Sequence, residues 1–204
     1  MTIRPAVIGH WRGIYLTMIA RLEQFDLTER ALLISVITSA ALLAGAHLFE
    51  RVGGLVPCIL CLDQREAHWA ALGVAAAGLF VSRVFRANIG AAAAVGAAAL
   101  VYAVSAGLAF YHTGVEYGYW PGPAICSGAG SIGDLDLNTV IDALDQKADA
   151  PSCEDVQWRF MGVSMAGYNL LISAGLFVLT TLATIAETRR ARAARTGEIA
   201  GGVS

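Results

Sequence analysis

Residues 31–49 read ALLISVITSAALLAGAHLF, nineteen consecutive positions without a charged side chain. An apolar helix of about this length crosses a hydrocarbon core of roughly 30 Å. The composition of the whole chain agrees, because 56% of its 204 residues are hydrophobic and only 15% are charged. Soluble domains have roughly 45–50% apolar and about 25% charged residues. The sequence therefore excludes an ordinary soluble domain, and its net charge of −2 offers no basic surface for nucleic acid.

Three further apolar blocks predict three more membrane spans. They run from about residue 60 to 82, from 88 to 111 and from 161 to 186, and the third span is rich in Ala and Gly. Small residues of this kind let helices pack closely in lipid. Residues 26–29, DLTE, predict a capping box that opens the first helix. The expected fold is an all-α membrane protein, a four-transmembrane-helix bundle.

The distribution of Lys and Arg predicts the orientation of the bundle. Ten of them flank one side of the spans and four flank the other. Because cytoplasmic loops carry the excess of positive charge, both termini are expected in the cytoplasm. The loops at about 50–66 and 112–160 then face outward. The expected organisation is a cytoplasmic segment over 1–30, a transmembrane domain over 31–186 and a basic cytoplasmic tail over 187–204.

The long outward loop is expected to carry a short amphipathic helix. Its apolar residues recur at helical spacing, namely Leu137, Val140, Ile141 and Leu144. The helix either lies on the membrane surface or caps the bundle, and the sequence leaves both arrangements open.

All four cysteines, Cys58, Cys61, Cys126 and Cys153, fall on the outward side. In a bacterium this side is the periplasm, where disulfides persist, and an even number predicts two pairs. Cys58 and Cys61 form a C-x-x-C, the spacing of pairs that cycle between dithiol and disulfide. Cys126 and Cys153 can meet only if the loop folds back, so we expect their disulfide to be movable.

The alternative roles for the cysteines and histidines are a structural disulfide, a zinc site and a haem site. The loop pair fits a structural disulfide as well as a redox pair. A zinc site is disfavoured because Cys126 and Cys153 lack the short spacing of a zinc knuckle. A c-type haem is excluded because Leu62 stands where the attachment motif requires histidine. A haem held by His47 and His112 would leave the placement of the cysteines unexplained.

Two further side chains border the outward end of the spans. Arg65 follows Cys61 by four residues, so it lies one helical turn along the same face. A guanidinium there favours a thiolate and attracts electron density on a bound carbonyl oxygen, although a helix-end Arg can also simply reach the lipid headgroups. His112 ends the third span and His47 lies near the end of the first. Each histidine is a candidate for a pocket wall, with a purely structural role as the alternative.

The residues around the C-x-x-C resemble a known family. The run PCILCLDQR over 57–65 is similar to the P-C-x-L-C-x-x-x-R signature of the bacterial disulfide-bond-formation protein B (DsbB) family. The resemblance continues through YHT at 111–113, the two loop cysteines, and WRFMGVSM at 158–165. It extends from about residue 30 to 186.

The resemblance implies an enzyme of the bacterial inner membrane. It implies that the protein reoxidises a periplasmic thioredoxin-like dithiol oxidase of the DsbA type and passes the electrons to membrane quinone, ubiquinone or menaquinone. By the same resemblance, the reduced partner attacks Cys126, and Cys153 resolves the mixed disulfide or passes the electron pair on. Cys61 is then the thiolate that faces the quinone and Cys58 is its exchange partner. Arg65 and His112 are the implied quinone contacts.

Two rival functions make different predictions. A quinone reductase of the vitamin K epoxide reductase type also has a four-helix bundle and a C-x-x-C motif. In that family the motif follows the loop cysteines in the sequence, whereas here it precedes them. A non-catalytic membrane scaffold with two structural disulfides predicts that no cysteine becomes linked to another protein.

Overall fold

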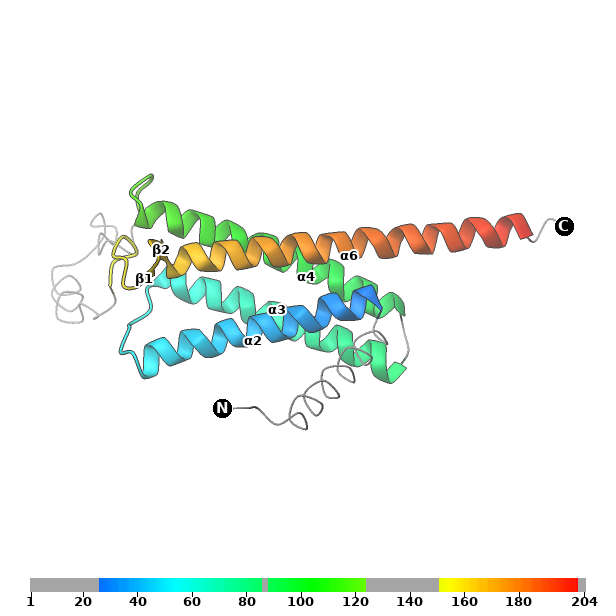
Figure 1. Ribbon diagram of the computed structural model, residues 1–204, viewed down its shortest axis with the longest axis horizontal. Coiled ribbons are helices and arrows are strands. Elements are labelled where there is room, and N and C mark those ends of the chain that lie inside the picture. The colour runs from blue at the N-terminus through cyan, green and yellow to red at the C-terminus, as the bar shows by residue number, and fades with distance from the viewer. Residues whose placement is uncertain (1–25, 86–87, 124–150, 202–204) are drawn as a thin grey trace, which may run out of the picture.

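The computed structural model describes residues 26–85, 88–123 and 151–201. Each of its four long helices contains a stretch long and apolar enough to cross a membrane, which confirms the expected four-span helical bundle. The helices and the one small antiparallel hairpin lie in the order shown in Figure 1: α2 Leu27–Arg51, α3 Ile59–Phe85, α4 Asn88–Glu116, β1 Arg159–Phe160, β2 Val163–Ser164 and α6 Met165–Gly201.

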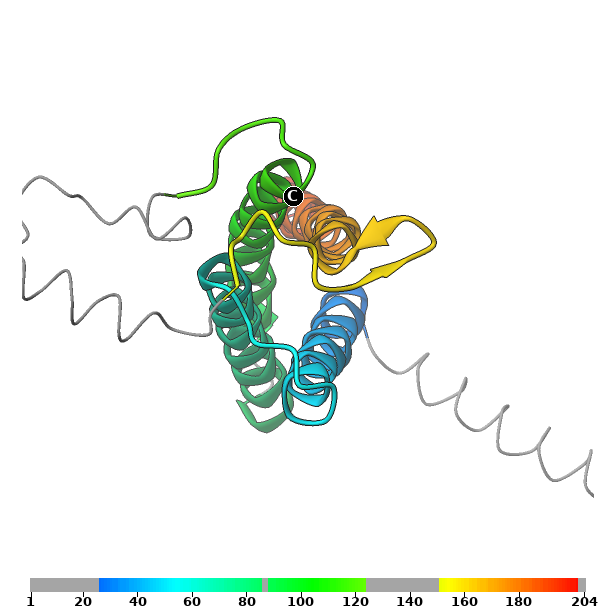
Figure 2. The same cartoon turned by 90° about the vertical axis from the view of Figure 1, so that its left-hand side faces the viewer.

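The helices run alternately up and down, so α2 and α4 end where α3 and α6 begin (Figure 1). We call this the cysteine end of the bundle. Helix α4 packs against α3 and α6, and α2 packs against the same two helices. Figure 2 looks onto the cysteine end and shows the hairpin standing at the start of α6.

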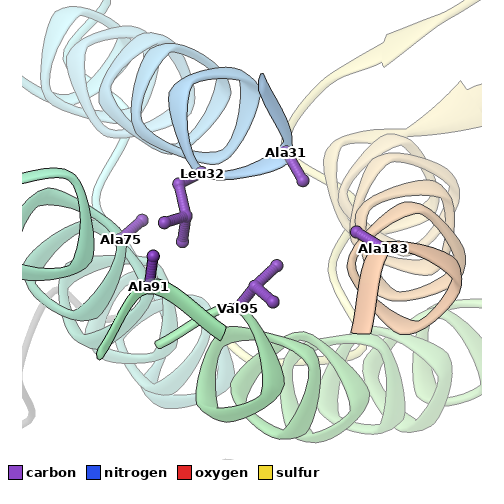
Figure 3. Close-up of a cluster of buried hydrophobic side chains, with 6 residues drawn as sticks. All are labelled: Ala31, Leu32, Ala75, Ala91, Val95 and Ala183. Carbon is purple, nitrogen blue, oxygen red and sulfur yellow. The ribbon is translucent and has the colours of Figure 1, made fainter. Parts of the chain in front are cut away.

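Small side chains from all four helices form the core at the opposite end. One buried cluster consists of Ala31, Leu32, Ala75, Ala91, Val95 and Ala183 (Figure 3). A Cβ atom at Gly78 of α3 would collide with the Cβ of Ala94 on α4. Glycine is therefore required for this close approach, as the small-residue composition of the third span suggested.

The start of α2 confirms the expected cap in part. The side chain of Asp26 accepts a hydrogen bond from the Glu29 backbone N–H at 2.9 Å. The Glu29 carboxylate does not return to the cap, as it would in a full capping box. It accepts from Ser82 Oγ at 2.5 Å and pairs with Arg83 Nε at 3.1 Å, which ties the start of α2 to the end of α3.

The fourth helix differs from its expected bounds. It begins at Met165, not at residue 161, because Met161 and Gly162 adopt positive φ values of 48° and 82° and turn the chain through the hairpin. Ser164 Oγ then accepts from the Gly167 backbone N–H at 3.1 Å and caps the new helix. The helix continues to Gly201, so much of the expected tail over 187–204 extends α6 beyond the other helices (Figure 1).

Three sequence predictions lie outside the described residues. They concern the segment before residue 26, the amphipathic helix over 137–144, and Cys126.

Candidate active site

The C-x-x-C lies at the cysteine end, where the chain enters α3. Cys58 immediately precedes the helix and Cys61 lies in its first turn. Both are free cysteines, and their sulfurs are 3.1 Å apart. The Cys61 backbone N–H also donates to Cys58 Sγ at 3.4 Å. The Cys58 sulfur thus takes the place of an N-cap acceptor, where the helix dipole favours a negative charge.

The contacts of the pair favour Cys58 as the thiolate. The hydrogen bond from the Cys61 thiol is the largest cause that lowers the pKa of Cys58, burial opposes it, and His112 adds to it, leaving a pKa of about 4. Low-pKa thiols of this kind are the reactive ones in C-x-x-C motifs. The family resemblance implied Cys61 as the thiolate that faces the quinone, and this role stays a prediction, whereas the contacts of the reduced pair with the Cys61 backbone N–H and with His112 favour a negative charge on Cys58.

His112 lies on α4 directly across from the C-x-x-C. Its side chain is buried, with Nε2 3.6 Å from Cys58 Sγ and 3.9 Å from Glu116 Oε1. On the other side of the ring, Gln64 Nε2 lies 2.8 Å from Nδ1. His47 lies apart from this group, half exposed, with Nδ1 3.7 Å from Glu50 Oε2. Of the two candidate histidines, only His112 reaches the cysteines.

A cavity of about 400 Å³ opens beside the dithiol. Cys58, Cys61, Arg65 and His112, which the family resemblance implied as site residues, all line it. The remaining wall is mostly apolar and comes from α2, the segment between α2 and α3, the residues at and just before β1, and α6, including Leu42, Phe49, Leu55, Trp158, Phe160 and Ile172. Its volume falls within the usual range for small-molecule sites, and a few polar groups in an apolar wall are typical of them.

Arg65 is held in place by a residue that sequence reasoning missed. Its Nη1 lies 2.5 Å from Oε2 of Glu50, near the end of α2, and only 14% of its side chain is exposed. The guanidinium therefore pairs with α2 at the cavity wall and does not extend to the lipid headgroups.

Cys153 lies beside the C-x-x-C. It is disulfide-bonded and 1% exposed, and it belongs to one buried cluster with Cys58, Leu60 and Val115. The sequence predicted a movable disulfide between the loop cysteines, and this stays a prediction, but the Cys153 half of the pair is buried and not exposed on a mobile loop. Its expected partner, Cys126, lies outside the described residues.

Several buried polar side chains behind His112 were also missed by sequence reasoning. Asn169 of α6 donates through Nδ2 to Gln64 Oε1 at 2.6 Å, and its Oδ1 lies 2.8 Å from Nε2 of His68. Polar residues inside membrane spans are expensive and usually functional, so Gln64, His68 and Asn169 could have been singled out on that ground.

The donor set at the dithiol does not fit a metal ion well. The ligand atoms of Cys58, Cys61 and His112 all lie within 4.8 Å of one another. A metal-binding histidine normally donates its other ring N–H to an acceptor. Here Gln64 donates to Nδ1 of His112, which leaves the ring hydrogen on Nε2, the atom that faces the sulfurs.

These features define a class of protein. A reduced C-x-x-C at the wall of an apolar cavity, with a disulfide-bonded cysteine packed beside it in a four-span bundle, is the arrangement of a membrane thiol–disulfide oxidoreductase.

Comparison with known proteins identifies the family. The family model for "Disulfide bond formation protein DsbB" matches residues 28–183, and the chain therefore belongs to this family. The chain is also 28% identical, over 174 residues, to Disulfide bond formation protein B of Pasteurella multocida (strain Pm70), an alignment that covers 80% of this chain and 89% of that relative. The protein is a multi-pass membrane oxidoreductase of disulfide bond formation, which decides against the scaffold alternative.

Proposed function

We propose that the protein reoxidises a periplasmic DsbA-type dithiol oxidase and transfers the electrons to membrane quinone. The observation that carries this proposal is that Cys58 and Cys61 share one apolar cavity with Arg65 and His112 at the end of the membrane spans. The excess of Lys and Arg at the opposite end supports cytoplasmic termini in the bacterial inner membrane, with the cysteine end in the periplasm.

The first half of the reaction is disulfide exchange with the partner. A thiolate of the reduced partner attacks Cys126 of the loop disulfide, and Cys153 leaves as a thiolate. The second partner thiol then attacks the mixed disulfide, so the partner leaves oxidised and Cys126 and Cys153 remain as a dithiol. Burial of Cys153 supports this division of roles, because a protein partner cannot reach a buried sulfur.

The second half moves the electron pair inward. The loop dithiol reduces the disulfide form of Cys58 and Cys61, and the packing of Cys153 against Cys58 supports direct exchange. A low thiol pKa stabilises the reduced pair and so makes its disulfide a stronger oxidant. This property is needed in a protein that must draw electrons from an already oxidising partner.

The cavity fits a quinone headgroup as the electron acceptor. A quinone takes up two electrons and two protons, which matches the oxidation of one dithiol. Arg65 and His112 supply donors at the wall, and the apolar remainder suits a lipid-soluble ring and tail. The ion pair with Glu50 holds the Arg65 guanidinium at the cavity wall.

Trapping of the partner tests the exchange half. The Cys153→Ala variant, mixed with an oxidised DsbA-type protein, should form a mixed disulfide, because the free Cys126 thiolate attacks the disulfide of the partner and releases one partner thiol. The Cys126→Ala variant is the matched control and should form none. An adduct that persists in the Cys126→Ala variant, or no adduct in either, contradicts the assignment of Cys126.

A further inference from the structure

A chain of buried hydrogen bonds runs from the active site into the middle of the bundle. Its members come from α3, α4 and α6; Gln64, His68 and His112 are buried and Asn169 is half-buried. In order from the dithiol inward, they are His112, Gln64, Asn169 and His68.

The backbone fixes the direction of the first link. The Gln64 side-chain amide presents one terminal atom to both the Leu60 carbonyl oxygen, at 3.1 Å, and His112 Nδ1, at 2.8 Å. The Leu60 carbonyl can only accept, so this atom must be the NH₂ group. The opposite orientation would place two oxygens in contact. Gln64 therefore donates to His112, and its Oε1 faces Asn169.

The next links agree with this direction. Asn169 Nδ2 donates to Gln64 Oε1 at 2.6 Å, which leaves Asn169 Oδ1 as an acceptor. This oxygen accepts from Ser173 Oγ at 3.2 Å and faces His68 Nε2 at 2.8 Å. The far nitrogen of His68 is 3.3 Å from Ser39 Oγ. Each amide of the chain thus has partners at both ends, and neither can turn over alone.

The hydrogen bond donated by the Gln64 side chain determines the tautomer of His112. Because Nδ1 accepts from Gln64, the ring hydrogen of the neutral imidazole lies on Nε2. Nε2 is the atom that faces Cys58 Sγ at 3.6 Å. The other tautomer would turn a lone pair toward the negatively charged sulfur, which is repulsive.

We propose that Gln64 and Asn169 are positioning residues that hold His112 in the tautomer whose Nε2–H donates to the Cys58 thiolate. This inference rests on the proposed function only in taking Cys58 as a redox sulfur. Asn169 acts through Gln64, and Gln64 acts through His112. Within the described part of the chain, the ionisable groups that face Cys58 are Cys61, His112 and Glu116.

The test measures Cys58 directly, without quinone or partner. The full-length protein carrying Cys126→Ala and Cys153→Ala is reduced in detergent, and the rate of Cys58 alkylation by iodoacetamide is followed against pH with peptide mapping. Asn169→Leu should raise the midpoint of the Cys58 alkylation profile by about one pH unit, the shift expected when a hydrogen bond to a charged group is weakened. Gln64→Met, which keeps the length of the side chain, should raise it equally and provides a second variant if the first folds poorly.

A double-mutant cycle separates positioning from a general structural effect. In a His112→Ala background, Asn169→Leu should leave the midpoint unchanged, because the residue through which it acts is gone. Thr180→Ala is the matched control on α6, since Thr180 is buried and donates only to carbonyls of its own helix. This variant should leave the midpoint of Cys58 alkylation unchanged.

Two results overturn the inference: no shift in either the Asn169 or the Gln64 variant, or an equal shift with and without His112. Failure of the proposed function gives a different result, because the wild-type protein would then fail to reduce quinone while the alkylation midpoints still respond as described.

Discussion

Replacing Cys61 should show which of the two sulfurs carries the negative charge in the reduced pair. The two sulfurs are 3.1 Å apart, and the contact with Cys61 is the largest cause of the low Cys58 pKa of about 4. A hydrogen bond to a charged group contributes roughly 1.5–3 kcal/mol. Since one pKa unit corresponds to about 1.4 kcal/mol, Cys61→Ala should raise the midpoint of Cys58 ionisation by about one to two pH units.

The assay is the pH profile of Cys58 alkylation in reduced protein that lacks both loop cysteines. Thiolate reactivity rises with thiol pKa with a Brønsted slope of about 0.4–0.5. The Cys61→Ala variant should therefore react about threefold to tenfold faster than its parent at high pH, yet more slowly near pH 4, so the two profiles cross. Cys61→Ser retains a hydroxyl donor and should give a smaller shift.

Peptide mapping shows which of the two cysteines is alkylated first. Cys58 should be the first sulfur modified in the parent protein, with a rate that stays nearly constant from pH 8 down to pH 5. Preferential modification of Cys61, or the same Cys58 midpoint after Cys61→Ala, refutes the assignment of the thiolate to Cys58.

Three further predictions address packing, the cavity and pH. Gly78→Ala should destabilise the bundle by about 1–3 kcal/mol, measured by thermal unfolding in detergent, because the new methyl group meets Ala94. The matched control is Gly73→Ala on the same helix, where a Cβ atom meets open space, and it should leave the unfolding temperature unchanged or raise it. Equal losses of stability in the two variants would contradict the packing explanation. Arg65→Met should raise the KM for quinone by about ten- to a hundredfold, as expected for a lost hydrogen bond from a charged group, and Arg65→Lys by less; an unchanged KM would remove Arg65 from the site. Because folding lowers the Cys58 pKa, its ionisation stabilises the reduced protein above the unfolded pKa, and this stabilisation is lost as the pH falls through about 4. Melting temperatures of reduced protein should therefore fall from pH 8 to pH 4 more than those of oxidised protein, and parallel curves would count against a Cys58 thiolate.

The fold was predictable because apolar runs in a membrane protein leave few alternatives. Hydrogen-bonding requirements in lipid force each long apolar stretch into a helix, and all four spans were placed from the sequence. The start of α6 was misplaced because residues 161–163 continue the apolar pattern of the helix toward its N-terminus. Only the positive φ of Met161 and Gly162 turns them into a hairpin.

The candidate site was predictable where its residues are close in sequence. The C-x-x-C and Arg65 follow from local spacing on one helix, which periodicity reveals. Glu50 and Asn169 act through contacts with other helices, and Asn169 lies 105 positions from Gln64. Such pairings depend on how the helices are rotated against one another, which no local pattern encodes. The choice between Cys58 and Cys61 as thiolate likewise depends on the position of His112 across the bundle.

Quinone reduction by the purified protein, driven by a reduced DsbA-type protein, tests whether electrons pass from the loop cysteines through the C-x-x-C to quinone. The wild-type protein should reduce ubiquinone or menaquinone analogues with one quinone consumed per partner disulfide formed. Turnover should vanish in Cys58→Ala and in Cys126→Ala, while both variants keep the melting temperature of the folded bundle. Turnover that survives either substitution, or no turnover with any quinone, would contradict the relay from the loop cysteines through the C-x-x-C to the cavity.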